Sequence, residues 1–202
     1  MKKEIVILTL LAKQGENCVI AYDLEEKKLI RLVSNTDGSP VPNAIAESVK
    51  LLDIVEVDIK ETCPLEHQTE NVLIDPEFGF RKTDALSNIN QLPLEENRGP
   101  DIFGDTHYKL TDVSHLNHSL ELITFKNLSL YIEKSFYHNQ LKSKADFTHD
   151  GKLYEKYFVT DPNFLYNSGI VSSGCAIVSL PLSNDFTSEH GYFKFLAGIY
   201  HY

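Results

Sequence analysis

The sequence has 202 residues and a formal net charge of -10, with 19 Lys and Arg residues against 29 Asp and Glu residues. This length suits one or two small domains, each with its own hydrophobic core. Hydrophobic residues make up 42% and charged residues 24% of the chain, so disorder, a collagen helix and a coiled coil are disfavoured. The acidic balance also disfavours a general DNA-coating protein, because that kind of binding needs Lys and Arg residues to neutralise phosphates.

The N-terminal region argues against both a membrane span and export. Its longest apolar run, 5–12, is far shorter than the roughly 20 residues that cross a bilayer. Lys2 and Lys3 resemble the start of a signal peptide, but no small-residue cleavage site follows them. We therefore expect a cytoplasmic protein with no membrane partner. The three cysteines form no CxxC pair and no even set, so we expect reduced, buried thiols. They are Cys18, Cys63 and Cys175.

The first half of the sequence is typical of short strands separated by turns. Runs rich in β-branched and apolar residues predict strands at 5–11, 18–22, 29–34 and 51–59. The charged residues 23–28 predict a hairpin connection, and 35–40 predicts a loop. Residues 43–52 predict one short helix with Asn43 as its N-cap. Residues 77–92 have a weaker helical spacing of apolar side chains, and 93–105 predicts a linker with two prolines and two glycines.

Beyond this linker the strand pattern returns. Strands are predicted at 120–125, 128–133, 153–159, 170–180 and 192–199. The chain is therefore predicted to be mainly β, with two halves of about 100 residues that suit two small barrels better than one large sandwich. We expect the domains to be 1–98, which includes the helical segment, and 99–202.

Five strings carry a resemblance to a known family. In chain order they are GENCVIAYDLEEKKLIRLVS (15–34), LLDIVEV (51–57), HQTENVLID (67–75), VTDP (159–162) and GYFKFLAGIY (191–200). Together they resemble a bacterial family described as a dual OB-containing domain, over nearly the whole chain. The resemblance implies two OB-like β-barrels with short helices in the connections. By analogy with OB folds generally, it also implies binding of nucleic acid, a nucleotide or a protein.

Candidate ligand-binding residues of the first half lie in two of these strings. A strand places Arg31 on the face opposite its apolar neighbours, where a guanidinium can hold a phosphate or a carboxylate with two hydrogen bonds. The alternative is an arginine on a wet face or paired with an internal acid. Ser34 ends the same string and is the second candidate.

The densest polar group of the chain follows in the QTEN string. A strand there would place Gln68 and Glu70 on one face and His67 and Asn71 on the other. Such side chains either read base edges or brace a turn internally. Bracing is the favoured interpretation, because short polar side chains commonly satisfy loop backbones. Ligand binding stays open.

Candidates in the second half are an acid, a lysine and two tyrosines. Asp161 precedes a proline at a strand end and is expected to cap a short helix more readily than to bind a metal. Lys194 lies between two phenylalanines of a strand, so it is expected to point away from the core, where it either contacts a phosphate or is an ordinary surface lysine. Tyr157 and Tyr192 are predicted on a binding face, where bases can stack.

Nothing in the sequence indicates catalysis. The P-loop, dinucleotide-binding, zinc-protease and nucleophile-elbow motifs are missing from it. His115 and His118 are three residues apart, but no acid or Cys motif completes a metal site. Cys18 with His67 is the one thiol and base pair worth weighing, and Cys18 begins an apolar strand. We therefore predict no catalytic residue, no metal and no cofactor.

The leading hypothesis is a noncatalytic binding protein that recognises single-stranded nucleic acid or a nucleotide at a local site. The alternative is a protein-interaction module whose acidic surface meets a basic protein partner, such as an accessory subunit of a bacterial defence or conflict system. A third hypothesis is a small nucleotide-processing hydrolase, for which His67 and Glu70 are the pair to test.

Overall fold

The protein is described by a computed structural model that covers residues 1–13, 16–92, 99–134, 141–183 and 190–202. It is mainly β, as predicted. The chain divides into two compact units, Met1–Glu95 and Glu96–Tyr202. The predicted domain boundary, between residues 98 and 99, falls at the edge of the segment 93–98 outside the described residues and stays a prediction. None of the described helices is long and apolar enough to span a membrane.

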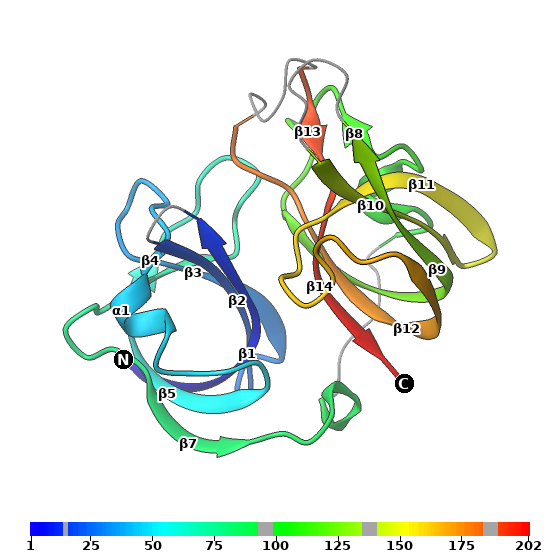
Figure 1. Ribbon diagram of the computed structural model, residues 1–202. Coiled ribbons are helices and arrows are strands. Elements are labelled where there is room, and N and C mark those ends of the chain that lie inside the picture. Colours follow the sequence, from blue (N-terminus) through cyan, green and yellow to red (C-terminus); the bar gives the residue numbers. More distant parts are fainter. Residues whose placement is uncertain (14–15, 93–98, 135–140, 184–189) are drawn as a thin grey trace. The chain divides into compact units, whose positions relative to one another are not determined.

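In the first unit, five of the described strands form a closed ring (Figure 1). They are β1 (Lys2–Lys13), β2 (Glu16–Asp23), β3 (Lys28–Val33), β5 (Asp53–Thr62) and β6 (Asn71–Ile74). The order around the ring is β1-β2-β3-β6-β5, and β5 pairs with β1 to close it. The pairing of β3 with β6 is parallel, and the other pairings are antiparallel.

The core of the first ring follows from alternation along these strands. Residues two apart point to the same side of a strand, so every second apolar residue faces the interior. Val19 and Ala21 of β2 and Ile30 and Leu32 of β3 belong to one buried cluster in this way. The side chains between them therefore lie on the outer face of the barrel wall.

Two expectations for the first unit need correction. The helix predicted at 43–52 is present only as the four residues of α1 (Asn43–Ala46), and Pro42 rather than Asn43 is its N-cap residue. The helical spacing at 77–92 is misleading, because β7 (Arg81–Ala85) is extended there and pairs with β5. All five side chains of β7 are exposed, so no apolar period marked it as a strand. A 3-10 helix, η1 (Ile89–Gln91), and a two-residue strand, β4 (Val41–Pro42), complete this unit.

The second unit is a closed barrel with the same connectivity (Figure 1). Its strands are β9 (Leu120–Lys134), β10 (Leu141–His149), β11 (Lys152–Val159), β12 (Gly169–Ser179) and β14 (Phe195–His201). The order is β10-β11-β14-β12-β9, and β11 pairs with β14 in parallel. In both units the third strand thus lies parallel to the fifth, and the fourth pairs with the first. This is the connectivity of an OB fold, so the prediction of two OB-like barrels is confirmed.

The second unit also departs from the sequence-based expectations. The two strands predicted at 120–125 and 128–133 are one long strand, β9, and β10 was not predicted at all. The two-residue strands β8 (Lys109–Leu110) and β13 (Tyr192–Phe193) form a separate ribbon. The predicted linker 93–105 contains a 3-10 turn, η2 (Ile102–Gly104), whose first two side chains are buried in the barrel core.

Candidate ligand-binding site

Arg31 lies on the outer face of the first barrel, as predicted from its apolar neighbours. Its Nη1 donates to the sulfur of Cys18 on the adjacent strand at 3.2 Å. Its backbone N–H donates to the carbonyl of Glu70 at 3.1 Å. Only 7% of Arg31 is exposed, so it is not an open arginine on a wet surface. Its role as a ligand contact stays a prediction.

The QTEN string forms turns before β6, so the predicted alternation of residues 67–71 along a strand is wrong. His67 and Gln68 are both buried although they are neighbours. Asn71 begins β6, pairs with Arg31 in register and donates from Nδ2 to Oε1 of Gln68 at 3.4 Å. The structure therefore brings Arg31, Gln68 and Asn71 to one end of the parallel pair, while Glu70 is partly exposed.

These polar contacts have the character of internal bracing. The backbone of Gln68 exchanges hydrogen bonds with Leu65, at 2.8 and 3.1 Å. The hydroxyl of Ser34 donates to the carbonyl of Pro40 at 2.7 Å and so closes the predicted loop 35–40. Bonds of this kind fix turns, whereas the buried Oδ1 of Asn71 accepts no hydrogen bond from the described residues. Ligand contacts by this group remain a prediction.

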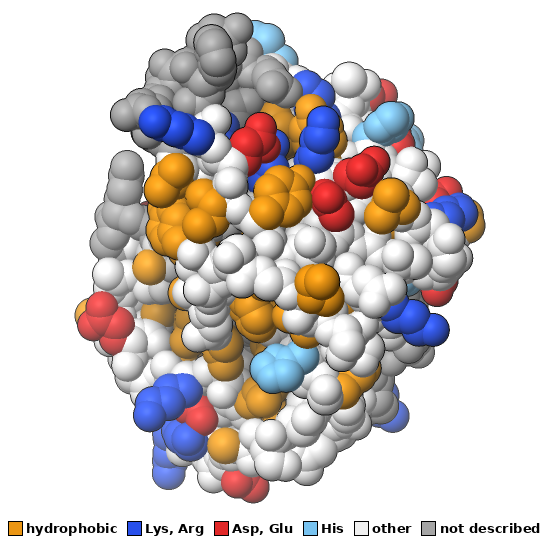
Figure 2. Space-filling view, turned by 45° about the vertical axis from the view of Figure 1, so that its right-hand side comes forward, with side chains coloured by type: hydrophobic (Ala, Val, Ile, Leu, Met, Phe, Trp, Pro, Cys, Tyr) orange, Lys and Arg blue, Asp and Glu red, His pale blue; other side chains and the backbone are white. Residues whose placement is uncertain are grey.

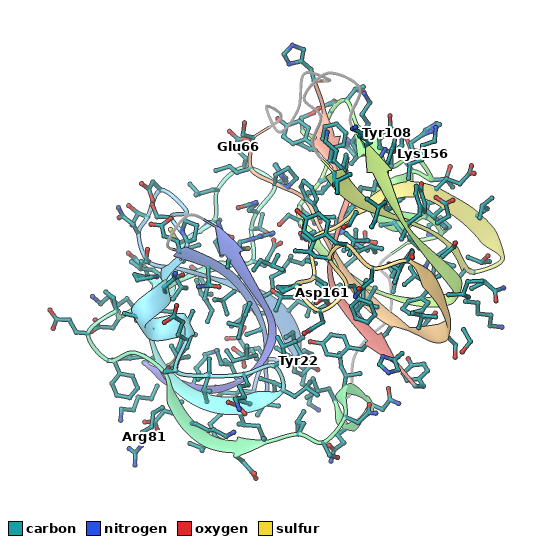
Figure 3. All side chains as sticks on the ribbon, in the orientation of Figure 1. Tyr22, Glu66, Arg81, Tyr108, Lys156 and Asp161 are labelled. Carbon is teal, nitrogen blue, oxygen red and sulfur yellow. The ribbon has the colours of Figure 1, made fainter. Side chains whose placement is uncertain are left out.

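Three of the four candidates in the second unit are buried. Tyr157, predicted on a binding face, belongs to the barrel core, where its ring packs edge-on against Phe147 with centroids 5.1 Å apart. Asp161 (labelled in Figure 3) accepts hydrogen bonds from the N–H groups of Asn163 at 2.9 Å and Ile199 at 2.7 Å. Burial raises the pKa of Asp161. It therefore braces a turn against β14, and no helix follows it. Tyr192 is partly buried against the core.

Lys194 is the clearest departure from prediction, because it is completely buried instead of pointing away from the core. Its Nζ donates to the carbonyl of Ile102 at 2.7 Å and to that of Asp105 at 2.6 Å. Burial lowers the pKa of Lys194 to about 8, and the charges of Asp105, Glu121 and Asp101 oppose that shift. A phosphate contact by this amine is not available while both carbonyls hold it.

The buried amine makes the stability of the protein depend on pH. Above about pH 8 the folded state releases the Lys194 proton, while an unfolded chain keeps it up to the ordinary lysine pKa of 10.5. Stability therefore rises with pH over this window. The neutral amine still has two hydrogens for its two carbonyls. Between pH 7 and 9.5 we expect the free energy of unfolding of the wild type to rise by about 2 kcal/mol relative to Lys194→Met. Denaturant unfolding of both proteins across this pH range measures the difference. Free energies of unfolding that change with pH in the same way in the wild type and in Lys194→Met would contradict the prediction.

A candidate site that the sequence did not reveal lies on the outer wall of the second barrel. Lys144 of β10, Phe158 of β11 and Phe195 of β14 are neighbours in register and form one row across three strands. The row faces outward, because the adjacent residues of these strands belong to the core. With their surroundings they make what we call the aromatic-lysine face. Its residues are Tyr108, Lys109, Lys142, Lys144, Phe158, Phe193 and Phe195.

Lysine amines cover the rings of this face. Nζ of Lys142 and Nζ of Lys144 lie 5.3 and 5.2 Å from the centroid of the same ring, that of Phe158. This ring meets that of Phe193 edge-on at 5.3 Å. Nζ of Lys109 in turn lies 5.7 Å from the Phe193 ring and 5.9 Å from that of Tyr108 (labelled in Figure 3). Hydrophobic side chains likewise lie beside Lys and Arg side chains in the upper part of Figure 2.

The position of this face within the barrel is informative. OB folds bind oligonucleotides and oligosaccharides over their second and third strands. In the second barrel these strands are β10 and β11, which carry Lys142, Lys144 and Phe158. In the first barrel they are β2 and β3, whose outer face carries Cys18 and Arg31. The sequence signal was the Lys-Ser-Lys of 142–144, which an alternating strand places with both lysines on one side.

The described residues offer no metal centre. Among them, no three His, Cys, Asp or Glu side chains gather in a group that could hold an ion. Nε2 of His118 instead contacts Oε1 of Glu121 at 2.9 Å. All three cysteines are free thiols, and Cys63 and Cys175 are buried. Burial raises the pKa of Cys63.

Comparison with known proteins agrees with this architecture. Residues 3–199 match the family model described as a dual OB-containing domain. Searches of curated proteins and of solved structures give no match. The family match spans both barrels, the first four strings that carried the resemblance and the fifth up to residue 199. The chain therefore belongs to the family of dual OB-containing domains.

Proposed function

We propose that this protein is a noncatalytic binding protein that holds single-stranded nucleic acid on the aromatic-lysine face of its second barrel. The observation that carries the proposal is the placement of two lysine amines over one outward-facing aromatic ring, on the wall where OB folds bind their ligands. Sequence-tolerant OB proteins combine a positively charged track for phosphates with rings for bases. Both parts are present here within one cluster.

The lysines support the part of the proposal that concerns binding of the phosphates. The amines of Lys142 and Lys144 both approach the ring of Phe158. Lys144 forms an ion pair with Glu133, whereas Lys142 has no carboxylate partner among the described residues. An anionic oxygen beside the Lys142 amine would supply the missing opposite charge. A phosphate is therefore a more suitable ligand than a neutral sugar.

The aromatic rings support the part of the proposal that concerns the bases of the nucleic acid. Phe158, Phe193 and Phe195 form a cluster of their own, outside the core of the barrel. Phe158 is 7% exposed, and two lysine amines and the rings of Phe193 and Phe195 lie against it. Phosphates that draw the amines aside would uncover the ring for a base. Stacking on such a ring contributes about 1–3 kcal/mol per base, which is enough for a local site on an acidic protein.

The other hypotheses have weaker support. Arg31, His67, Gln68 and Asn71 are buried, so a ligand at the first barrel would need them to move. His67 is 2% exposed, which leaves a hydrolase little surface on which to use it. A protein partner, including one in a bacterial defence system, is the outcome that a failure of nucleic-acid binding would favour. The free thiols support the proposal of a cytoplasmic location.

The proposal predicts a salt-dependent affinity that depends on two lysines. A labelled single-stranded oligonucleotide of about 12 residues, as DNA and as RNA, is titrated with protein in fluorescence anisotropy at several salt concentrations. With three lysines on phosphates, we expect log K to fall against log salt with a slope of about -2. For Lys142→Ala/Lys144→Ala we expect a slope of about -0.7 and an affinity about tenfold lower at low salt.

The matched control is Lys50→Ala/Lys126→Ala, which removes the same charge from two exposed lysines outside the face. It should keep most of the affinity and the slope. Equal effects of the two double variants would mean that only net charge matters and would overturn the site. Absence of binding to either oligonucleotide at tens of micromolar protein would overturn the function.

A further inference from the structure

Residues 100–105 form a strap that packs into the core of the second barrel without joining its sheet. Ile102 and Phe103 insert into the barrel core. Phe103 and Gly104 have positive φ values of 52° and 74°, which turn the chain back on itself. A segment with this backbone has few hydrogen bonds of its own, so its position depends on side chains that reach it from the barrel.

Three side chains of the barrel hold the strap's backbone. Lys194 donates to the carbonyls of Ile102 and Asp105. Glu121 accepts the N–H of Phe103 at 3.0 Å. Lys152 donates to the carbonyl of Pro100 at 3.1 Å. Of the two lysines, Lys194 is fully buried, whereas the side chain of Lys152 is 46% exposed.

Lys194 is also part of the chain that carries the aromatic-lysine face. Its neighbours in sequence are Phe193 and Phe195, and its own N–H donates to the carbonyl of Tyr108 at 2.9 Å. Next to that bond, Phe193 pairs with Lys109 in the β8–β13 ribbon. Lys194 thus binds the strap through its side chain and the β8–β13 ribbon through its backbone N–H.

We propose that Lys194 is the positioning residue of the aromatic-lysine face, holding Tyr108, Lys109 and Phe193 in place through the strap. The strap ends at Asp105 and the ribbon begins at Lys109, so a fixed Asp105 carbonyl limits where the ribbon can move. The amine faces the ring of Tyr157 at 5.9 Å and the charges of Asp101, Asp105 and Glu121. These groups enclose the Lys194 amine, so it does not contact a phosphate as the sequence suggested.

The positioning role is tested by Lys194→Met, with Lys152→Met as the control that loosens the same strap from an exposed lysine. Amide hydrogen exchange reports on the strap and the ribbon directly, without any ligand. We expect at least about tenfold faster exchange at Gly104, Asp105 and Lys194 in Lys194→Met, with β9 and β12 unchanged. Oligonucleotide affinity should fall about fivefold, since the ribbon's half of the face is no longer held. Lys152→Met frees only the Pro100 and Asp101 end of the strap, so exchange at these three amides and the affinity should both change much less than in Lys194→Met.

The expected loss of oligonucleotide affinity rests on the proposed function, whereas the expected change in amide exchange does not. The two measurements therefore distinguish a failure of the proposed function from a failure of the positioning role. Faster exchange in a protein whose wild type binds no oligonucleotide would reject the function and keep the positioning of the ribbon. Unchanged exchange at the three amides, or faster exchange with unchanged affinity, would overturn the coupling. If Lys194→Met does not fold, Lys194→Gln retains one amide donor and is subjected to the same two measurements.

Discussion

Replacing Gly174 with alanine is expected to destabilise the second barrel by about 3 kcal/mol or more, the upper end of the usual cost of overpacking. An added Cβ would lie 2.0 Å from the carbonyl oxygen of Tyr200 and 2.7 Å from Cζ of Phe125. The first of these atoms is backbone in β14, which pairs with β12 at this residue. The strand pair must therefore separate to admit a methyl group.

Denaturant unfolding of Gly174→Ala, followed by tyrosine fluorescence and circular dichroism, measures this loss. Gly99→Ala is the control, because among the described residues its Cβ would have no neighbour closer than 3.8 Å and its φ is not positive. We expect the control to stay within about 0.5 kcal/mol of the wild type. A loss below about 1 kcal/mol for Gly174→Ala would show that β12 and β14 do not approach each other this closely.

Asp23→Ala is expected to cost the first barrel about 3–5 kcal/mol, the usual penalty for removing one partner of a buried ion pair. Oδ2 of Asp23 accepts a hydrogen bond from Nζ of Lys3 at 2.8 Å, and the side chains are 2% and 4% exposed. Oδ1 accepts the N–H groups of Glu25 and Glu26, both at 2.9 Å. Burial lowers the pKa of Lys3, but bonding to Asp23 and Glu26 raises it more, so the amine stays charged.

The control for this prediction is Asp37→Ala. Asp37 makes the same kind of turn bond, to the N–H of Ser39 at 2.9 Å, but it is exposed and holds no lysine. Its loss should cost about 1 kcal/mol or less. In Lys3→Met/Asp23→Ala no buried charge is left alone, so the double variant should lose less than the sum of the single ones. Additive losses would contradict a coupled pair.

The strands of both barrels were predictable where apolar residues alternate with polar ones, and the family strings supplied the rest of the architecture. The strand β10 was not predicted, because two of its inward-facing residues are Ser143 and Ala145, whose small side chains give little apolar signal. The two lysines on its other side, Lys142 and Lys144, are equally typical of a solvated stretch of chain. The candidate site was missed with the strand, because its lysines and Phe158 come together only through strand pairing.

Lys194 shows a different limit of sequence reasoning. Lysines are almost never fully buried unless they are paired. Its partners here are two backbone carbonyls, which carry no residue-specific signal and lie far away in the chain. By contrast, Arg31 and Asn71 were predicted separately as candidates in two different strings, and their adjacency depends on the parallel pairing of β3 with β6. Local patterns do not reveal such long-range contacts.

The parallel pair in each barrel has a consequence for how the chain folds during synthesis. A parallel partner cannot be supplied by a hairpin, so β3 must wait for β6, and β11 must wait for β14. The first barrel can close once Ile74 has left the ribosome, before the strands β9 to β14 of the second barrel have emerged. The second stays open until β14, its last strand, emerges. Its edges therefore stay unpaired until that last strand emerges, and they are where nascent chains would meet chaperones or one another.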